Sequence, residues 1–380
     1  MKSTFKGRPT FCSIDIGSLC WNFRQAKKKV GPGVRILSVV KANAYGHGER
    51  EVATALESEG TNGLGVATLE EGVALRRSGI SSPILVLSSV LPKQLDGLFE
   101  NHLTPVISEG EGLRELEEKA QRRELALPFH LKVDTGMGRI GFLASETATW
   151  LPKLKNLKAL RLEGILSHFA DAERFAQDTT RRQLDSFHCV LQQLEANGVR
   201  PALVHLANSA AVISIPAAHF TMVRPGLMLY GLYPTPKMVA ATTLKPVLSW
   251  KTQVIQLKKV PKGFSVSYGG TFVTKRESLL ATLPVGYGDG YKRLLSNRGS
   301  VLVRGQRAPV VGSVTMDLTM ADVTGIRGVR QGDEVILLGK QGKETISADE
   351  MARWAQTISY EILTSIGIRV PRIYENQREG

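Results

Sequence analysis

A lysine at the end of a short apolar run is the first residue of this sequence that could do chemistry. The apolar run spans residues 36–40, Lys41 follows it directly, and the small, glycine-containing stretch 42–48 comes next. A lysine at a strand end, partly shielded from water, has a lowered amine pKa and attacks carbonyl carbons as a nucleophile. A lysine in an ordinary surface loop is the alternative, so the surrounding residues have to decide between the two.

Strand-like and helical patterns alternate around this lysine and after it. The predicted strands are 36–40, 63–67, 84–87, 103–106, 129–134, 161–167, 203–206 and 221–223. The predicted helices include 15–30, 49–57, 69–78, 92–101, 110–122 and 174–197. This alternation predicts an α/β fold, a parallel (β/α)8 barrel of the TIM type. A doubly wound open sheet is the alternative, but no predicted strand leads into the glycine fingerprint of dinucleotide-binding sheets.

Polar residues follow several predicted strands, at the end where such barrels carry their active sites. These residues are Lys41, Asp134, Arg139, His168, Asn208, Ser209, Arg224 and Gly226. The strands 63–67, 84–87 and 103–106 end without such residues and are expected to serve as barrel wall. The predicted barrel therefore gathers its chemistry at one end.

The pattern changes after residue 240. Short apolar runs punctuated by glycine follow at 279–283, 299–304, 309–314 and 334–338. One helix is predicted at 347–359, with Ser347 and Glu350 in the spacing of a capping box. We therefore expect a barrel domain in residues 1–240 and a mainly β domain in residues 241–380.

Residues 39–48, VVKANAYGHG, and further motifs in both predicted domains resemble those of alanine racemases, from Pro9 to Tyr374. The sequence is therefore identified as a member of this family of pyridoxal-phosphate (PLP) enzymes of fold type III. The resemblance implies that Lys41 holds PLP as a Schiff base (an aldimine) and exchanges a proton on one face of the substrate Cα. It implies further cofactor contacts from Tyr45, His168, Asn208, Ser209, Arg224, Gly226, Leu227 and Tyr360. Ser209 could equally cap the helix that follows it, and the two roles are compatible.

Arg224 distinguishes between kinds of PLP chemistry. The resemblance places it against the pyridine nitrogen of the cofactor, with His205 orienting it from the preceding strand. Because arginine keeps its proton, the ring nitrogen stays unprotonated, which weakens PLP as an electron sink and favours racemisation over transamination. A PLP decarboxylase on the same plan is expected to have a glutamate at this position, so the sequence argues against it. An arginine that bridges strand ends is the structural alternative.

Racemisation needs acid–base groups on both faces of a planar carbon, and the resemblance implies Tyr268 as the counterpart of Lys41. A tyrosine hydroxyl, whose pKa is ordinarily about 10, is a weak base at neutral pH and needs an assisting group. The resemblance gives that role to His168, hydrogen-bonded toward Arg224 and therefore neutral. In the family this tyrosine reaches the cofactor from the other subunit, which predicts a homodimer with shared active sites. The alternative for His168 is a hydrogen-bonded core histidine, and the alternative for Tyr268 is an aromatic residue of a β-hairpin.

The substrate carboxylate is expected, again from the resemblance, to bind Arg139 and the backbone amide of Met316. Tyr287 is expected to line the entrance and limit side-chain size, with Asp317 near the same channel. Thr315 departs from the small residue that is usual in the family at that position, which leaves the pocket shape open.

Lys132 and Asp134 face the same side of one predicted strand, which favours a mutual salt bridge. Family members often carry a carbamate on the matching lysine, whose negative charge positions the carboxylate-binding arginine. The resemblance implies such a carbamate on Lys132, since an unmodified amine would repel Arg139. Both interpretations stay open at this point.

Composition argues against several other classes of protein. The net charge is +14, but the basic residues are scattered and the aromatic residues, 6% of the chain, do not alternate with them as a nucleic-acid surface would require. No apolar run approaches the roughly 18 residues that span a membrane, and residues 1–9 lack the apolar core of a secretory signal. The three cysteines lack the spacing of a disulfide framework or a metal site. We therefore expect a cytoplasmic protein without metal, nucleic-acid or membrane partners.

The sequence thus predicts an alanine racemase, an isomerase that interconverts L- and D-alanine with PLP and supplies D-alanine for the peptidoglycan of the cell wall. A racemase of broader specificity would keep the same cofactor contacts and is one alternative. A PLP-carrier protein without turnover is the other, but it would leave the β domain with Tyr268 unexplained.

Overall fold

The computed structural model describes residues 7–174 and 178–375, which form two compact units. The barrel unit contains residues 18–44 and 49–245. The β unit contains the residues up to Gly17, Tyr45–Gly48 and the residues from Pro246 onward. Within the described residues no helix is long and apolar enough to cross a membrane.

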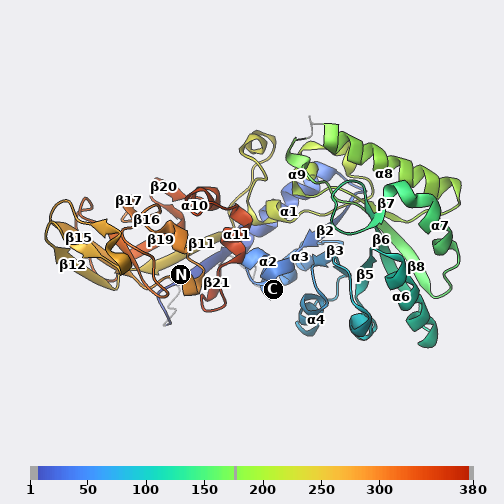
Figure 1. Cartoon of the computed structure of the whole chain (residues 1–380), viewed down its shortest axis with the longest axis horizontal. Coiled ribbons are helices and arrows are strands. Elements are labelled where there is room, and N and C mark those ends of the chain that lie inside the picture. The colour runs from blue at the N-terminus through green and yellow to red at the C-terminus, as the bar shows by residue number, and fades with distance from the viewer. Residues whose placement is uncertain (1–6, 175–177, 376–380) are drawn as a thin grey trace. The chain divides into compact units, whose positions relative to one another are not determined.

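Eight parallel strands close into a ring within the described part of the barrel unit (Figure 1). They are β2 (Arg35–Val39), β3 (Gly63–Val66), β4 (Ile84–Val86), β5 (Thr104–Ile107), β6 (Leu127–Asp134), β8 (Leu160–Leu166), β9 (Leu203–His205) and β10 (Met222–Val223). Neighbouring strands pair in the order β5-β4-β3-β2-β10-β9-β8-β6, and a pairing of β5 with β6 closes the ring. All eight strands predicted for the barrel are confirmed, with bounds that differ by at most two residues, and so is the predicted barrel.

The barrel strands are mainly apolar because parallel strands are covered on both faces. Every residue of β3 and β4 is buried, and β6 has a single residue that is not. One buried apolar cluster draws a residue from each of six strands: Leu37, Leu85, Val106, Leu166, Leu203 and Met222. This continuous burial is why the strands could be predicted from sequence.

Helices lie around the barrel strands, as Figure 1 shows for α4, α6, α7 and α8. The helices in the barrel unit, counting α1 with it, are α1 (Ile16–Val30), α2 (Lys41–Gly46), α3 (Glu49–Ser58), α4 (Leu69–Arg77), α5 (Leu95–Glu100), α6 (Gly110–Arg122), α7 (Thr147–Lys155), α8 (Asp178–Ala196) and α9 (Ser209–Ser214). The helix predicted at 92–101 begins as a short 3-10 turn, Pro92–Gln94, before α5. Part of the helix predicted at 174–197, residues 175–177, lies outside the described residues, and the remainder is α8.

The β unit is built mainly of strands, which confirms the predicted second half of the fold. Its largest sheet has the order β17-β16-β19-β11-β1-β21, and a second sheet has the order β12-β15-β18. The first sheet contains β17 (Gln306–Pro309), β16 (Ser300–Val303), β19 (Glu334–Gln341), β11 (Leu248–Gln253), β1 (Phe11–Asp15) and β21 (Arg372–Glu375), with β20 (Glu344–Ile346) paired to β19. The second contains β12 (Gln256–Val260), β15 (Ser278–Leu283) and β18 (Thr319–Asp322), and β13 (Ser265–Val266) pairs with β14 (Phe272–Val273).

Two expectations for the β unit are wrong. The single helix predicted at 347–359 is two helices, α10 (Ala348–Trp354) and α11 (Ser359–Thr364), because Gln356 adopts a left-handed φ of 53° and ends the first. Ser347 does cap α10 by accepting a hydrogen bond from the N–H of Glu350. The run 309–314 contributes only the end of β17 and one isolated bridge, since Gly312 turns the chain with a φ of 75°.

Candidate active site

The backbone after Lys41 forms a left-handed turn. The φ angles of Ala42 to Tyr45 lie between 51° and 54°, although none of these residues is glycine. Each residue in this conformation costs about 1–2 kcal/mol, so the turn must be held from outside. Glu71 supplies one such contact, because its Oε1 accepts the N–H of Ala42 at 2.7 Å while its Oε2 accepts the N–H of Ala67 at 2.7 Å. The turn therefore fixes the position of the Lys41 backbone, from which the side chain extends.

The surroundings of Lys41 favour its neutral amine. Burial lowers the pKa of the Lys41 amine, and the positive charges of Arg139 and Arg224 lower it further against a smaller opposing effect of Glu71. A neutral amine is the form that attacks a carbonyl or accepts a proton.

Arg224 follows β10, is only 5% exposed, and is held by a dense set of hydrogen bonds. Its Nη1 donates to the carbonyl of His205 at 2.7 Å and to Nδ1 of the same residue at 3.1 Å. Its Nη2 donates to the carbonyl of Ser167 at 2.6 Å and to Nδ1 of His168 at 3.2 Å. Burial lowers the pKa of Arg224 to about 9, so the guanidinium still carries its proton at neutral pH. The contacts expected of His168 and His205 with Arg224 are both present.

The guanidinium of Arg224, which always donates, determines the tautomers of His168 and His205. Because Nδ1 of His168 and Nδ1 of His205 both accept from it, each imidazole carries its proton on Nε2. Burial, and then the charge of Arg224, lowers the pKa of both rings well below the ordinary value. Both histidines are therefore neutral at physiological pH.

A third histidine, His130, extends this cluster, and nothing in the sequence pattern marks it. Nε2 of His205 lies 2.8 Å from Nδ1 of His130, and Nε2 of His130 lies 3.4 Å from Glu163. With the tautomers set by Arg224, each ring donates to the next, and the chain of donors ends on a carboxylate. His130 lies inside β6, where a functional histidine cannot be distinguished by sequence from a hydrogen-bonded core histidine.

Ser209 and the backbone near Gly226 form a group of buried donors. The Ser209 hydroxyl accepts the N–H of Gly226 at 2.9 Å and the N–H of Met228 at 3.2 Å, which leaves its own hydrogen to donate. Asn208 caps α9 by accepting the N–H of Ala211, as an ordinary helix cap does. Among the described residues, the N–H groups of Ser209 and Leu227 have no hydrogen-bond acceptor, although both residues are buried. Buried backbone donors rarely lack a partner, so this group suits an anion.

The carboxylate of Asp134 organises the loop that carries Arg139. It accepts the N–H groups of Gly136 and Met137 at 2.8 Å each and that of Arg139 at 3.1 Å. No ion pair joins it to Lys132 among the described residues, so the salt bridge favoured by the sequence is wrong: the loop amides occupy the carboxylate. Burial, with the charges of Arg224 and Arg139, lowers the pKa of Lys132 well below the ordinary value.

In the β unit, Tyr45 and Tyr360 lie beside each other, with ring centroids 6.1 Å apart. Gly46 and Gly48 follow Tyr45, and both positions require glycine. Their φ angles are 83° and 99°, and an added Cβ would lie 2.2 Å from the carbonyl oxygen of Leu363 and 1.8 Å from the hydroxyl of Tyr374, respectively. The two glycines therefore allow this segment to pack closely against Leu363 and Tyr374.

Tyr268 projects from the turn between β13 and β14 and is 77% exposed. Its hydroxyl makes no hydrogen bond to any described residue, but its backbone is fixed. The Ser313 hydroxyl donates to the carbonyl of Tyr268 at 2.9 Å, and the Ser267 hydroxyl donates to the carbonyl of Ser313 at 2.7 Å. Ser267 has a left-handed φ of 63°, which sharpens the turn. The ring is presented outward on a rigid base.

Tyr287 and Met316 occupy two adjoining turns of the β unit. The N–H of Tyr287 donates to the carbonyl of Thr315 at 3.0 Å, and the N–H of Gly288 donates to the carbonyl of Met316 at 2.9 Å. Tyr287 and Met316 are 44% and 53% exposed, and Asp317 is also exposed. Within the described chain the N–H of Met316 has no acceptor, so it is available to a ligand.

Comparison with known proteins agrees with this architecture. The sequence model "Alanine racemase, N-terminal domain" matches residues 14–234, and "Alanine racemase, C-terminal domain" matches residues 247–374. An alanine racemase of Halothermothrix orenii is 48% identical over 373 residues, which is 98% of each chain. One from Carboxydothermus hydrogenoformans is 45% identical over 370 residues, 97% of this chain and 100% of that one.

Solved structures agree equally well. The crystal structure of alanine racemase from Bacillus anthracis with bound L-Ala-P has a TM-score of 0.92 and 38% identity, covering 98% of this chain and 96% of that one. The structure of alanine racemase from a D-cycloserine-producing Streptomyces lavendulae has a TM-score of 0.93 and 33% identity, covering 98% and 99%.

A (β/α)8 barrel together with a mainly β unit is the architecture that this chain shares with solved alanine racemases, which places it in the class of isomerases. The chain belongs to the alanine racemase family. It is a racemase, as the sequence predicted.

Proposed function

We propose that the protein interconverts L-alanine and D-alanine with PLP as cofactor, by proton transfer at Lys41 on one face of the substrate Cα and Tyr268 on the other. The observation that supports this proposal most is the charge distribution around Lys41. A buried amine beside Arg139 and Arg224 has a lowered pKa, which suits both attachment to an aldehyde and proton transfer near neutral pH.

The residues of the chain fit the groups of PLP. The unpaired buried N–H groups of Ser209 and Leu227 and the free hydrogen of the Ser209 hydroxyl suit its phosphate. Lys41 offers an amine to its aldehyde, and Arg224 offers a permanent donor to its ring nitrogen. Further contacts are proposed for Tyr45, His168, Asn208, Gly226 and Tyr360. When bound, PLP withdraws electrons from the substrate Cα and so acidifies its C–H bond.

Arg224 is proposed to keep the ring nitrogen unprotonated. Its guanidinium holds its own proton at neutral pH, and bonds to two histidines and three backbone carbonyls hold it in one orientation. Weaker electron withdrawal favours prompt return of the proton to Cα, and therefore racemisation over transamination. A glutamate in its place would favour a decarboxylase, and the chain has none there.

Tyr268 is proposed to act in the active site of a second copy of the chain. Its exposed ring and unpaired hydroxyl, on a backbone fixed by two serines, suit a group that is presented to another molecule. In the neighbouring site it would be assisted by His168, whose neutral ring can donate its Nε2 hydrogen to the tyrosine oxygen. A homodimer with shared active sites follows from this arrangement.

Arg139 and the N–H of Met316 are proposed to bind the substrate carboxylate, with Tyr287 and Asp317 limiting access.

Lys132 is proposed to carry a carbamate. Its lowered pKa leaves the amine neutral and able to add to carbon dioxide with loss of a proton, and the resulting anion would offset the charges of Arg224 and Arg139. High-resolution density that shows a bare amine on Lys132 would refute the carbamate.

The division of work that we propose assigns cofactor binding, apart from the contact of Tyr360, to residues 1–240 and the second base to residues 241–380. A cytoplasmic location and supply of D-alanine for peptidoglycan are part of the same proposal.

The reaction is tested by proton NMR of L-alanine in deuterated water with purified protein and added PLP, followed in parallel by circular dichroism. We expect loss of the α-proton signal together with loss of optical activity to a racemic mixture. L-serine in a parallel tube distinguishes an alanine-selective enzyme from a broader racemase. Absence of exchange with either amino acid, despite bound cofactor, would contradict the proposal and favour a carrier protein.

A further inference from the structure

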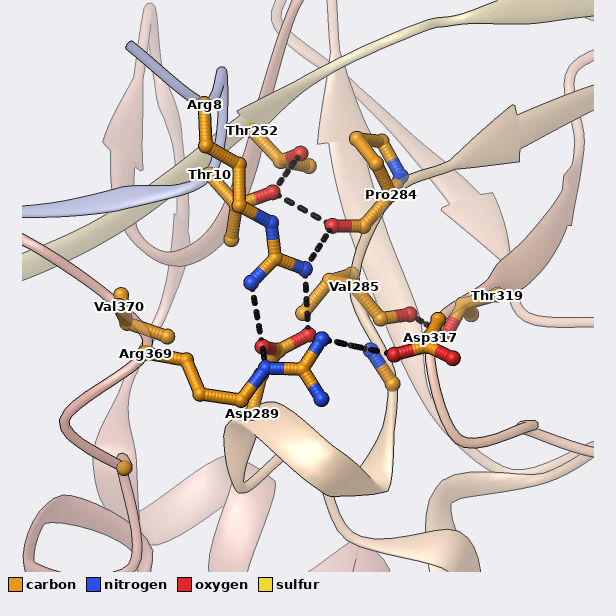
Figure 2. Close-up of polar contacts among 12 residues, drawn as sticks. Arg8, Thr10, Thr252, Pro284, Val285, Asp289, Asp317, Thr319, Arg369 and Val370 are labelled. Atoms are coloured by element: carbon orange, nitrogen blue, oxygen red, sulfur yellow. Dashed lines mark hydrogen bonds and ion pairs between the residues drawn. The ribbon is translucent and has the colours of Figure 1, made fainter.

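A buried carboxylate in the β unit, Asp289, is shared by two arginines. Its side chain is fully buried and accepts from Arg8 Nη1 at 2.5 Å and from Arg8 Nη2 at 2.7 Å. The Nε of Arg369 approaches the same carboxylate at 3.2 Å. Figure 2 shows Asp289 between the two guanidinium groups. A buried charge of this kind is strongly held, because loss of one partner leaves it uncompensated.

Asp289 anchors the turn that carries Tyr287. Its Oδ2 accepts the N–H of Gly286 at 3.1 Å, and its own N–H donates to the carbonyl of Gly286 at 3.0 Å. Arg8 also donates to the carbonyl of Pro284 at 2.7 Å, just before the turn. The turn from 284 to 289 is therefore bonded at both ends to one buried ion cluster.

This turn is packed directly against the turn that carries Met316. A Cβ added at Gly286 would lie 2.2 Å from the carbonyl oxygen of Thr315 and 2.4 Å from the carbonyl carbon of Met316. The two backbones are thus too close for any side chain, and they are joined by the hydrogen bonds of Tyr287 and Gly288 described above.

Arg369 connects the buried carboxylate to the far side of the Met316 turn. While its Nε faces Asp289, its Nη2 donates to Oδ1 of Asp317 at 2.7 Å (Figure 2). The N–H of Met316 shares its peptide plane with the carbonyl of Thr315, which the N–H of Tyr287 holds. The following peptide is held through the Met316 carbonyl by Gly288 and through Asp317 by Arg369. The Met316 N–H is the group left without an acceptor among the described residues.

We propose that Arg369 is a positioning residue that orients the Met316 N–H for the substrate carboxylate by tying Asp317 to the buried Asp289. This inference rests on the proposed function, in which that N–H binds the carboxylate. A backbone donor fixed in direction before the substrate arrives binds a carboxylate without a cost of reorganisation. The guanidinium suits this role because its planar fork reaches two carboxylates at once, whereas a lysine amine is a single point of charge.

Kinetics of the variants Arg369→Gln and Asp317→Asn, measured on the PLP-loaded full chain with L-alanine, test the proposal. We expect KM to rise about tenfold in each, the effect of one lost charge-assisted hydrogen bond, while kcat changes less than about threefold. Arg369→Lys should recover part of the loss. Arg307→Gln is the matched control, because Arg307 is a partly exposed arginine of the same unit that also bridges two carboxylates, Glu344 and Glu350. Its KM should stay at the wild-type value.

Amide hydrogen exchange of the unliganded protein gives a second readout that does not depend on turnover. Peptides covering 313–319 should exchange faster in Arg369→Gln than in wild type and at the wild-type rate in Arg307→Gln. An unchanged KM in Arg369→Gln, or an equal rise in Arg307→Gln, would overturn the proposal whatever the exchange shows. A wild-type protein that does not racemise alanine would refute the proposed function instead. The exchange comparison would then still decide whether Arg369 holds the Met316 turn.

Discussion

The barrel unit and the β unit place their proposed catalytic groups in opposite environments. Arg224, in the barrel unit, is 5% exposed and donates to two histidines and three backbone carbonyls, all within one chain. Tyr268, in the β unit, is 77% exposed, and its hydroxyl bonds to none of the described residues. The barrel unit therefore fixes the charges and hydrogen bonds around Arg224 internally. The β unit holds the backbone of Tyr268 in place for a side chain that we propose acts on another molecule.

The largest effect is expected from the barrel unit. Lys41→Ala should reduce racemisation by at least about 10⁴-fold, because it removes both the attachment point of the cofactor and one of the two proton carriers. The chromophore of the lysine-bound cofactor should disappear from the absorption spectrum as well. Lys259→Ala, at an exposed position of β12, is the control and should keep both properties. Substantial turnover in Lys41→Ala would break the assignment.

A smaller loss is expected when the geometry at Arg224 changes but its charge does not. Arg224→Lys cannot donate to His168 and His205 together, so about one to two charge-assisted hydrogen bonds are lost. We expect kcat/KM to fall by about 10- to 100-fold, measured by circular dichroism of alanine. Activity equal to wild type would show that charge alone suffices and that the hydrogen-bonded orientation has no role.

The internal histidines of the barrel unit should make its stability depend on pH. Burial lowers the pKa of His130, His168 and His205 in the folded state, whereas unfolding restores it to about 6.5. The unfolded chain then binds more protons, so the free energy of unfolding falls as the pH drops through about 6.5, by up to about 1.4 kcal/mol per pH unit for each histidine.

Urea unfolding measured between pH 7.5 and 5.5 checks this dependence. In His130→Asn the slope of stability against pH should be smaller by about a third, even if the absolute stability also changes. A wild-type stability that stays flat across this range would show that the three rings are not held neutral.

The smallest effect is expected at a helix cap in the β unit. Ser347→Ala removes the acceptor for the N–H of Glu350 at the start of α10, which should cost about 1 kcal/mol of stability. Racemase activity at 25 °C should not change, since no proposed site residue lies in this helix. Urea denaturation and the alanine assay on the same preparation measure both quantities. A drop in activity without loss of stability would contradict the expectation that α10 contributes to stability and not to catalysis.

Much of the fold could be predicted because burial leaves a direct mark on sequence. Most residues of the parallel strands β2 to β6 and β8 to β10 are buried, so these strands appear in the sequence as mainly apolar runs. Strand β1 gave no comparable signal, because its partners β11 and β21 lie more than 230 residues away along the chain. The break at Gln356 was missed for a related reason, since a left-handed glutamine has no signature in the pattern of apolar residues.

The sequence indicates candidate site residues but not the contacts that they make. The motif around Lys41 identified the lysine, yet its four consecutive left-handed residues include no glycine, so nothing in the sequence indicated the turn or its anchor, Glu71. Asp134 was matched to Lys132 because they alternate on one strand, whereas three loop amides outcompete the amine for its carboxylate. His130 and Arg369 contact residues distant in sequence, which only the folded chain brings together.

The two-base claim is tested most directly by Tyr268→Phe, which removes one hydroxyl from an exposed ring and leaves the barrel unit unchanged. L- and D-alanine are incubated separately with the PLP-loaded variant in deuterated water, and α-proton exchange and optical rotation are followed together. We expect Lys41 to exchange the α-proton of one enantiomer with retention of configuration, while racemisation falls by about 10²- to 10⁴-fold. Racemisation of both enantiomers at the wild-type rate would contradict a second base at Tyr268.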